Sequence, residues 1–169
     1  IINTSLMGTR RNKIAGSLAG YAADHQIGLT ILSRRAHDSD RLTLGAVGRE
    51  LIRLLDSPVL IVSASQHIQL SHTRVLVVPD DSEADHAIVR DAVDLAGMLA
   101  GAVVVIKPIP IDMLQAKAAA EQCEIVALSP NLDLGAGDSG TVQIADLLRH
   151  LHAGVLLHRE VRRSRPCSL

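Results

Sequence analysis

Two stretches decide the fold, Gly28-Leu29-Thr30-Ile31-Leu32-Ser33 and Glu124-Ile125-Val126-Ala127-Leu128-Ser129, because the same succession of elements follows each. From each apolar run the chain passes through a polar segment to a glycine, Gly45 in the first copy and Gly140 in the second. A helical pattern follows each glycine and ends at another apolar run, 59–62 and 155–157 respectively. This recurrence indicates an internal repeat, and therefore two related α/β units.

Apolar periodicity extends the pattern along the chain. It predicts strands at 29–33, 59–62, 74–78, 102–106, 125–128 and 155–157, and helices at 12–25, 44–55, 83–100, 112–122 and 142–151. Strands that alternate with helices of this length favour right-handed β-α-β crossovers. We therefore expect an α/β fold with a Rossmann-like or flavodoxin-like parallel sheet and helices on both faces.

Several local expectations accompany this assignment. The first helix should bury Ile14, Leu18, Tyr21 and Ala22 and end at Gly28 in the left-handed conformation. Residues 34–41 should form a loop in which Arg34 and Arg35 are solvated, and residues 63–73 a linker between the units. Because ligands of open α/β sheets bind outside the carboxyl ends of the strands, residues 33–45, 79–82 and 129–141 are expected at one functional edge.

Composition excludes several classes of function. The chain has 169 residues, 47% of them apolar, but no Phe or Trp and one Tyr, so its core must be aliphatic and it lacks platforms for base stacking. A net charge of −1 provides no basic field for a phosphate backbone, so no nucleic acid partner is expected. The longest apolar run, 95–106, is too short to cross a bilayer, so no membrane insertion is expected.

The two cysteines, Cys123 and Cys167, form no Cys-x-x-Cys pair, which favours reduced thiols and a cytoplasmic location. Cys123 lacks a flanking base and is expected to be a buried, inert thiol. His150 and His152 diverge on a helix and His158 follows at a distance, so no metal site is expected.

Two segments resemble the universal stress protein family. Residues 74–83, Arg-Val-Leu-Val-Val-Pro-Asp-Asp-Ser-Glu, are similar to that family's opening strand and turn. Residues 44–47 followed by Asp56-Ser57-Pro58-Val59-Leu60-Ile61-Val62 are similar to its closing helix and strand. On this resemblance, residues 1–63 are the C-terminal half of a first unit, residues 73–160 a shortened second unit, and residues 161–169 a basic tail.

The resemblance also implies a nucleotide site, because many family members bind ATP through a glycine-rich loop before a helix. The second unit keeps Gly140 and Thr141, and the Asp at the end of the opening strand is Asp80. The resemblance implies contacts with ATP or AMP, and no metal beyond the Mg²⁺ that accompanies it. These contacts would come from Asp80, Ser82, Ser129, Gly140, Thr141 and Val142, with Ser33 and Gly45 at the equivalent positions of the first unit.

Whether the loop still holds phosphate stays open at this point. The first unit keeps only one of the motif's glycines, Gly45, and Ala46 lacks the hydroxyl of the usual Ser or Thr. In the second unit Asp133 and Asp138 would repel a triphosphate. Ser33 and Ser129 would either touch a ligand or serve as polar ends of buried strands.

Three functions follow as hypotheses. The first is a cytoplasmic stress-response or regulatory protein that senses an adenine nucleotide. The second is the cytosolic regulatory domain of a larger membrane transporter, such as a cation/proton antiporter, because the chain begins at Ile1 and its first unit lacks a beginning. The third, a weak ATPase, has no nucleophile–base pair to support it. The resemblance also implies that the closing strands 59–62 and 155–157 pair with each other, either in a homodimer or in an intramolecular pseudo-dimer, which would cover an open edge of the sheet.

Overall fold

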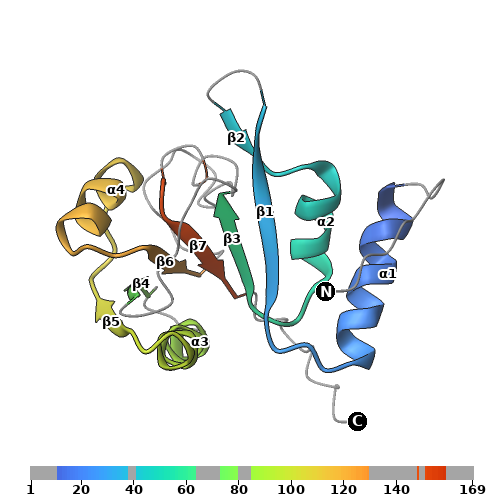
Figure 1. Ribbon diagram of the computed structural model, residues 1–169, viewed down its shortest axis with the longest axis horizontal. Coiled ribbons are helices and arrows are strands. Elements are labelled where there is room, and N and C mark those ends of the chain that lie inside the picture. Colours follow the sequence, from blue (N-terminus) through green and yellow to red (C-terminus); the bar gives the residue numbers. More distant parts are fainter. Residues whose placement is uncertain are drawn as a thin grey trace, which may run out of the picture.

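A seven-stranded sheet forms the centre of the part of the chain that the structure describes. The structure is a computed structural model that describes residues 11–37, 41–63, 73–79, 85–129, 148 and 151–158. The elements, in chain order, are α1 (Arg11–Asp24), β1 (Thr30–His37), β2 (Arg41–Thr43), α2 (Ala46–Leu54), β3 (Val59–Ser63), β4 (Arg74–Val78), α3 (Asp85–Met98), β5 (Ala102–Val105), α4 (Ile111–Ala120), β6 (Ile125–Leu128) and β7 (Gly154–Leu157). The sheet order is β2-β1-β3-β7-β6-β4-β5 (Figure 1).

Most neighbouring strands run parallel, as the periodicity predicts, and the fold is of the flavodoxin-like α/β type. β1 pairs parallel with β3, and β7, β6, β4 and β5 form a second parallel set. The two sets meet where β3 pairs antiparallel with β7, with Ile61 opposite Val155 and Val59 opposite Leu157. The strands expected to pair at an edge are therefore neighbours within this one chain.

Helices cover both faces of the sheet. On one face α1, α2 and α4 pack in a core that includes Leu51 and Ile52 of α2, Leu114 of α4 and Val126 of β6. On the other face α3 packs with Ile88, Ala92 and Leu95 against β4, β6 and β7. The first core contains residues from both parallel sets and so continues across the antiparallel junction.

Aliphatic side chains explain why the central strands form. Every residue of β6 and β7 is buried, and so is every residue of β4 after Arg74. Short continuous runs of Val, Ile and Leu are typical of parallel strands covered on both faces. These runs are also the strands whose limits the sequence predicts most closely.

The buried face of α1 differs from the expected one. Ala15 is fully buried and Ala19 and Ala22 pack against the core, whereas Leu18 and Tyr21 are 36% and 40% exposed. The larger side chains point away because α1 lies directly beside α2 (Figure 1), and small residues permit that approach. Apolar spacing alone does not distinguish these two stripes of the helix.

The end of α1 also differs from the prediction. The left-handed residue is Gln26, with a φ of 50°, and Gly28 needs no such conformation. Ala100 and Gln122 take the same role after α3 and α4, with φ values of 47° and 54°. After α1, α3 and α4 an N–H bonds to the carbonyl five residues earlier, for example Gly101 to Ala96 at 2.8 Å, which is the Schellman pattern.

Candidate functional site

The carboxyl ends of β4 and β6 lie at a topological switch point. From β4 the chain passes through α3, on one face of the sheet, to β5 on one side of β4. From β5 it passes through α4, on the other face, to β6 on the opposite side of β4. Where consecutive crossovers leave in opposite directions, a crevice opens outside the carboxyl ends, and open α/β sheets bind ligands there.

One expected site residue, Ser129, emerges beside this point, next to Pro79, the residue that precedes Asp80. Val78 of β4 is paired in register with Leu128 of β6, so Pro79 and Ser129 are the next residues along adjacent strands. Ser129 is 5% exposed and has an interaction partner. Asp80, Ser82, Gly140, Thr141 and Val142 lie outside the described residues, so their expected roles stay predictions.

An Asp–His pair that the sequence analysis missed lies at the same edge. Nδ1 of His158, the residue after β7, contacts the Asp91 carboxylate of α3, and both side chains are largely buried, at 15% and 13% exposed. His158 follows Leu157 as Ser129 follows Leu128, and those two leucines are register partners. Asp91 and His158 are 67 residues apart, so no local motif could have indicated their contact.

A cavity of about 300 Å³ opens next to this pair on the α3 face. Its lining consists of Gly28, Leu29, Pro58, Asp91, Asp94, Leu95, Met98 and Leu156. The two carboxylates make it a poor place for a phosphate, because like charges repel. A nucleotide at the switch point would therefore lie outside the strand ends and not in this cavity.

The first-unit candidates lie at the opposite edge of the sheet, so the expectation of one functional edge is wrong. Because β3 and β7 are antiparallel, β1 and β3 end at the edge where β4, β6 and β7 begin. Ser33 lies within β1 and is exposed, and it does not end a strand because β1 continues to His37. Gly45 precedes α2 with an extended backbone, and a Cβ there would meet nothing within 4 Å, so no close approach requires glycine.

The expectation of a solvated Arg34 is also wrong. Its side chain is 1% exposed, and Nη1 donates to the carbonyls of Leu148 at 2.9 Å and Leu151 at 2.8 Å. Nη2 donates to His152 at 3.2 Å and Ala153 at 3.4 Å, while Nε has no partner. Burial lowers the pKa of the Arg34 guanidinium. Residues 34–37 and 41 form strands and not the predicted loop, because β1 continues to His37 and pairs antiparallel with β2.

Cys123 is buried, as the sequence predicts. Its side chain is 7% exposed, its thiol donates to the Glu121 carbonyl at 3.7 Å, and burial raises the thiol's pKa. Within the described ranges, no group of three or more His, Cys, Asp or Glu residues could hold a metal ion. No helix in the same ranges is long and apolar enough to cross a membrane.

Comparison with known proteins identifies the fold. No family model and no curated protein matches the sequence. A proposed universal stress protein from Pseudomonas aeruginosa superposes with a TM-score of 0.64 at 14% identity, over 89% of this chain and 68% of that one. A Pseudomonas aeruginosa protein of unknown function gives a TM-score of 0.63, also at 14% identity and with the same shares of each chain.

A universal stress protein from Archaeoglobus fulgidus gives a TM-score of 0.61 at 13% identity, over 86% of this chain and 64% of that one. The chain thus has a universal-stress-protein-like fold. At identities this low, the superpositions establish the fold alone. The ligand has to be inferred from the chemistry of the site.

Proposed function

We propose that this chain is a universal-stress-protein-like regulatory protein of the cytoplasm that senses an adenine nucleotide, ATP or AMP. The switch point between the carboxyl ends of β4 and β6 is the observation that carries this proposal. Ligands of open α/β sheets bind at such points whatever the protein's activity, so the topology supports this position independently of the resemblance.

The residues that the sequence leads us to expect here would offer suitable chemistry. Asp80 follows Pro79 directly, so its carboxylate would reach the hydroxyls of a ribose or the edge of a base held beside Ser129. The backbone N–H groups of Gly140, Thr141 and Val142, with the Thr141 and Ser82 hydroxyls, would receive the phosphates, as N–H groups at the start of a helix do. Mg²⁺ bound with the nucleotide would offset repulsion from Asp133 and Asp138.

Calorimetric titration with ATP, ADP and AMP, each with and without Mg²⁺, tests the proposal. We expect saturable binding that Asp80→Ala weakens at least tenfold, because a hydrogen bond to a charged group contributes about 1.5–3 kcal/mol. Asp94→Ala removes an exposed carboxylate of α3 and is the matched control, with unchanged affinity expected. Failure of the folded protein to bind any of the three nucleotides would contradict the proposal. Turnover of bound ATP would indicate a weak ATPase instead of a sensor.

A further inference from the structure

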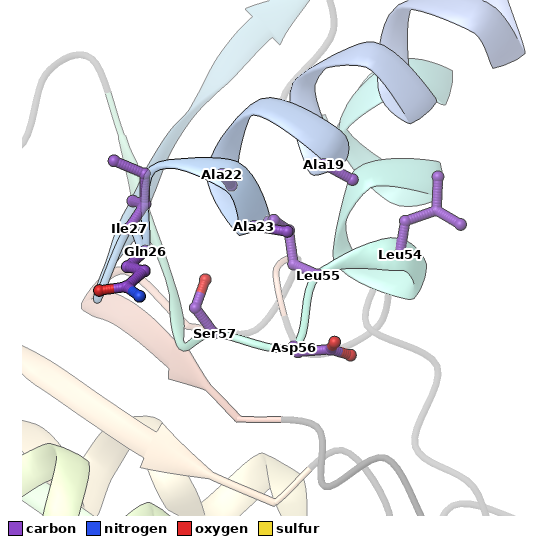
Figure 2. A pocket seen from close by; sticks show the side chains of 9 residues that line it. All are labelled: Ala19, Ala22, Ala23, Gln26, Ile27, Leu54, Leu55, Asp56 and Ser57. Atoms are coloured by element: carbon purple, nitrogen blue, oxygen red, sulfur yellow. The ribbon is translucent and has the colours of Figure 1, made fainter.

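A second cavity lies between the ends of α1 and α2 and has a volume of about 330 Å³. Its lining consists of Ala19, Ala22, Ala23, Gln26, Ile27, Leu54, Leu55, Asp56 and Ser57 (Figure 2). Most of these side chains are apolar, and the volume is at the lower end of those that hold small ligands. The alanines that bring α1 close to α2 also leave this space unfilled.

Ser57 is the unusual member of the lining. Its Oγ is buried and has no hydrogen-bond partner, and in Figure 2 it points toward the end of α1, across the cavity. A buried hydroxyl without a partner destabilises a fold, and such groups call for an explanation. A ligand in the cavity that hydrogen-bonds to Oγ would supply the missing partner.

The charge around the cavity selects the ligand's polar group. Both α1 and α2 end here, and the C-terminal end of a helix carries a partial negative charge. Asp56 adds an exposed carboxylate to the lining, and Asp24 is the last residue of α1. A cationic donor is favoured in such a field and an anion is disfavoured.

We propose that this cavity binds a small aliphatic amine, with the apolar part against the alanines and leucines and the ammonium group donating to Ser57 Oγ. The site is separate from the proposed nucleotide crevice. Gln26 and Ile27 precede β1, and Asp56 and Ser57 precede β3, so both sites share an edge of the sheet. However, β7 and β3 separate the cavity from the β4–β6 switch point.

The test titrates the full chain with cyclohexylmethylamine, cyclohexylmethanol and cyclohexanecarboxylate, and follows the methyl NMR signals of Ile27, Leu54 and Leu55. We expect the amine to bind with a dissociation constant of about 1 mM, typical of so small a ligand. The alcohol should bind more weakly, and the carboxylate should leave the signals unmoved. Equal shifts with all three probes, or none with the amine, would overturn the proposal.

Substitutions locate the binding. Ala23→Leu adds bulk to the lining from an exposed position and should abolish the shifts, and Ala22→Leu serves as a second filling variant. Ala119→Leu, also exposed but on α4, should leave amine binding unchanged. Retained binding in both filling variants would place the amine elsewhere.

Ser57→Ala separates a ligand role from a structural one. Removal of an unpartnered buried hydroxyl should raise the Tm by about 2–4 °C while weakening the amine about tenfold. A lower Tm with unchanged affinity would show that the hydroxyl supports the fold and would contradict the proposal.

Discussion

Arg34 is the residue whose environment departs most from expectation. Its guanidinium reaches four backbone carbonyls at 148 and 151–153, across the neighbouring strand β3. Backbone carbonyls carry no sequence signature, and the charge-rich surroundings of Arg34 are typical of a loop. A single buried cation therefore connects β1 to the start of β7.

Arg34→Met should lower the free energy of unfolding by about 3 kcal/mol, because it leaves several buried carbonyls without donors. Urea denaturation followed by circular dichroism measures this change. Arg90→Met, at an exposed position of α3, should change it by less than about 0.5 kcal/mol. Equal effects of the two substitutions would mean that the carbonyls find other partners.

The Cys123 thiol predicts a pH dependence. Because burial raises its folded-state pKa above the unfolded value, its contribution to stability is complete below the unfolded pKa. That contribution is lost as the pH rises from there through the folded pKa. The free energy of unfolding of the native sequence should therefore fall above about pH 8.5, and Cys123→Ala should fall less steeply. Parallel curves would show that other groups cause the loss.

At the scale of elements, the turn after α3 places two adjacent residues under different constraints, one on the backbone conformation of Ala100 and one on the space beside Gly101. Ala100 adopts a positive φ, which costs an L-residue about 1–2 kcal/mol, whereas Gly101 has no Cβ because one there would lie 1.8 Å from the Thr73 carbonyl oxygen. The chain thus has alanine where glycine would relieve strain, and glycine where the carbonyl of Thr73, the residue before β4, approaches.

The pair offers a matched experiment. Ala100→Gly should raise the free energy of unfolding by about 1 kcal/mol, and Gly101→Ala should lower it by about 2–3 kcal/mol because the strands must separate. Thermal unfolding of both variants beside the native sequence checks the signs. Stabilisation by Gly101→Ala would mean that Thr73 is not held against this turn.

How far the sequence predicts these elements depends on what surrounds them. The sequence predicts β6 with its observed limits, because a continuous aliphatic run between polar residues is by itself enough to indicate a buried strand. β1 was predicted too short, since its second half contains charged residues and pairs with β2. The contact of Asp91 with His158 arises only when α3 packs on the sheet, so neither residue indicates it.

At the scale of the whole molecule, the junction of β3 with β7 decides where the candidate sites lie. The adjacency of Pro79 and Ser129 follows from the pairing of β4 with β6, whereas the alternation of elements indicates parallel strands but not their order. The separation of Ser33 and Gly45 from them follows from an antiparallel pairing that neither strand's composition indicates. The division into residues 1–63, 73–160 and 161–169, and the alternative of a transporter's regulatory domain, stay predictions that the full-length gene will test.

The continuous core predicts one cooperative unfolding transition. Leu51 from α2 and Leu114 from α4 belong to the same buried cluster, so the two parallel sets should lose their packing together. NMR methyl signals of these two residues should disappear at the same urea concentration. Different midpoints would indicate two independent units.

We also propose that the chain is monomeric, because β3 and β7 already pair with each other and neither is left open for a second copy. Light scattering behind size-exclusion chromatography should give a mass near 18.0 kDa. A mass twice as large would contradict the proposal. It would indicate a dimer that pairs through β5 or β2, which are the outermost strands of the sheet.

The same junction has a consequence for chain continuity. β4 follows β3 in sequence, yet β7 and β6 lie between them, so the end of β3 and the start of β4 are about 14 Å apart in the sheet. Every strand pairing across the junction would survive a cut between residues 63 and 73. Residues 1–63 and 73–169, made as separate peptides, should therefore reassemble into the native sheet, which makes this domain a candidate scaffold for a split reporter.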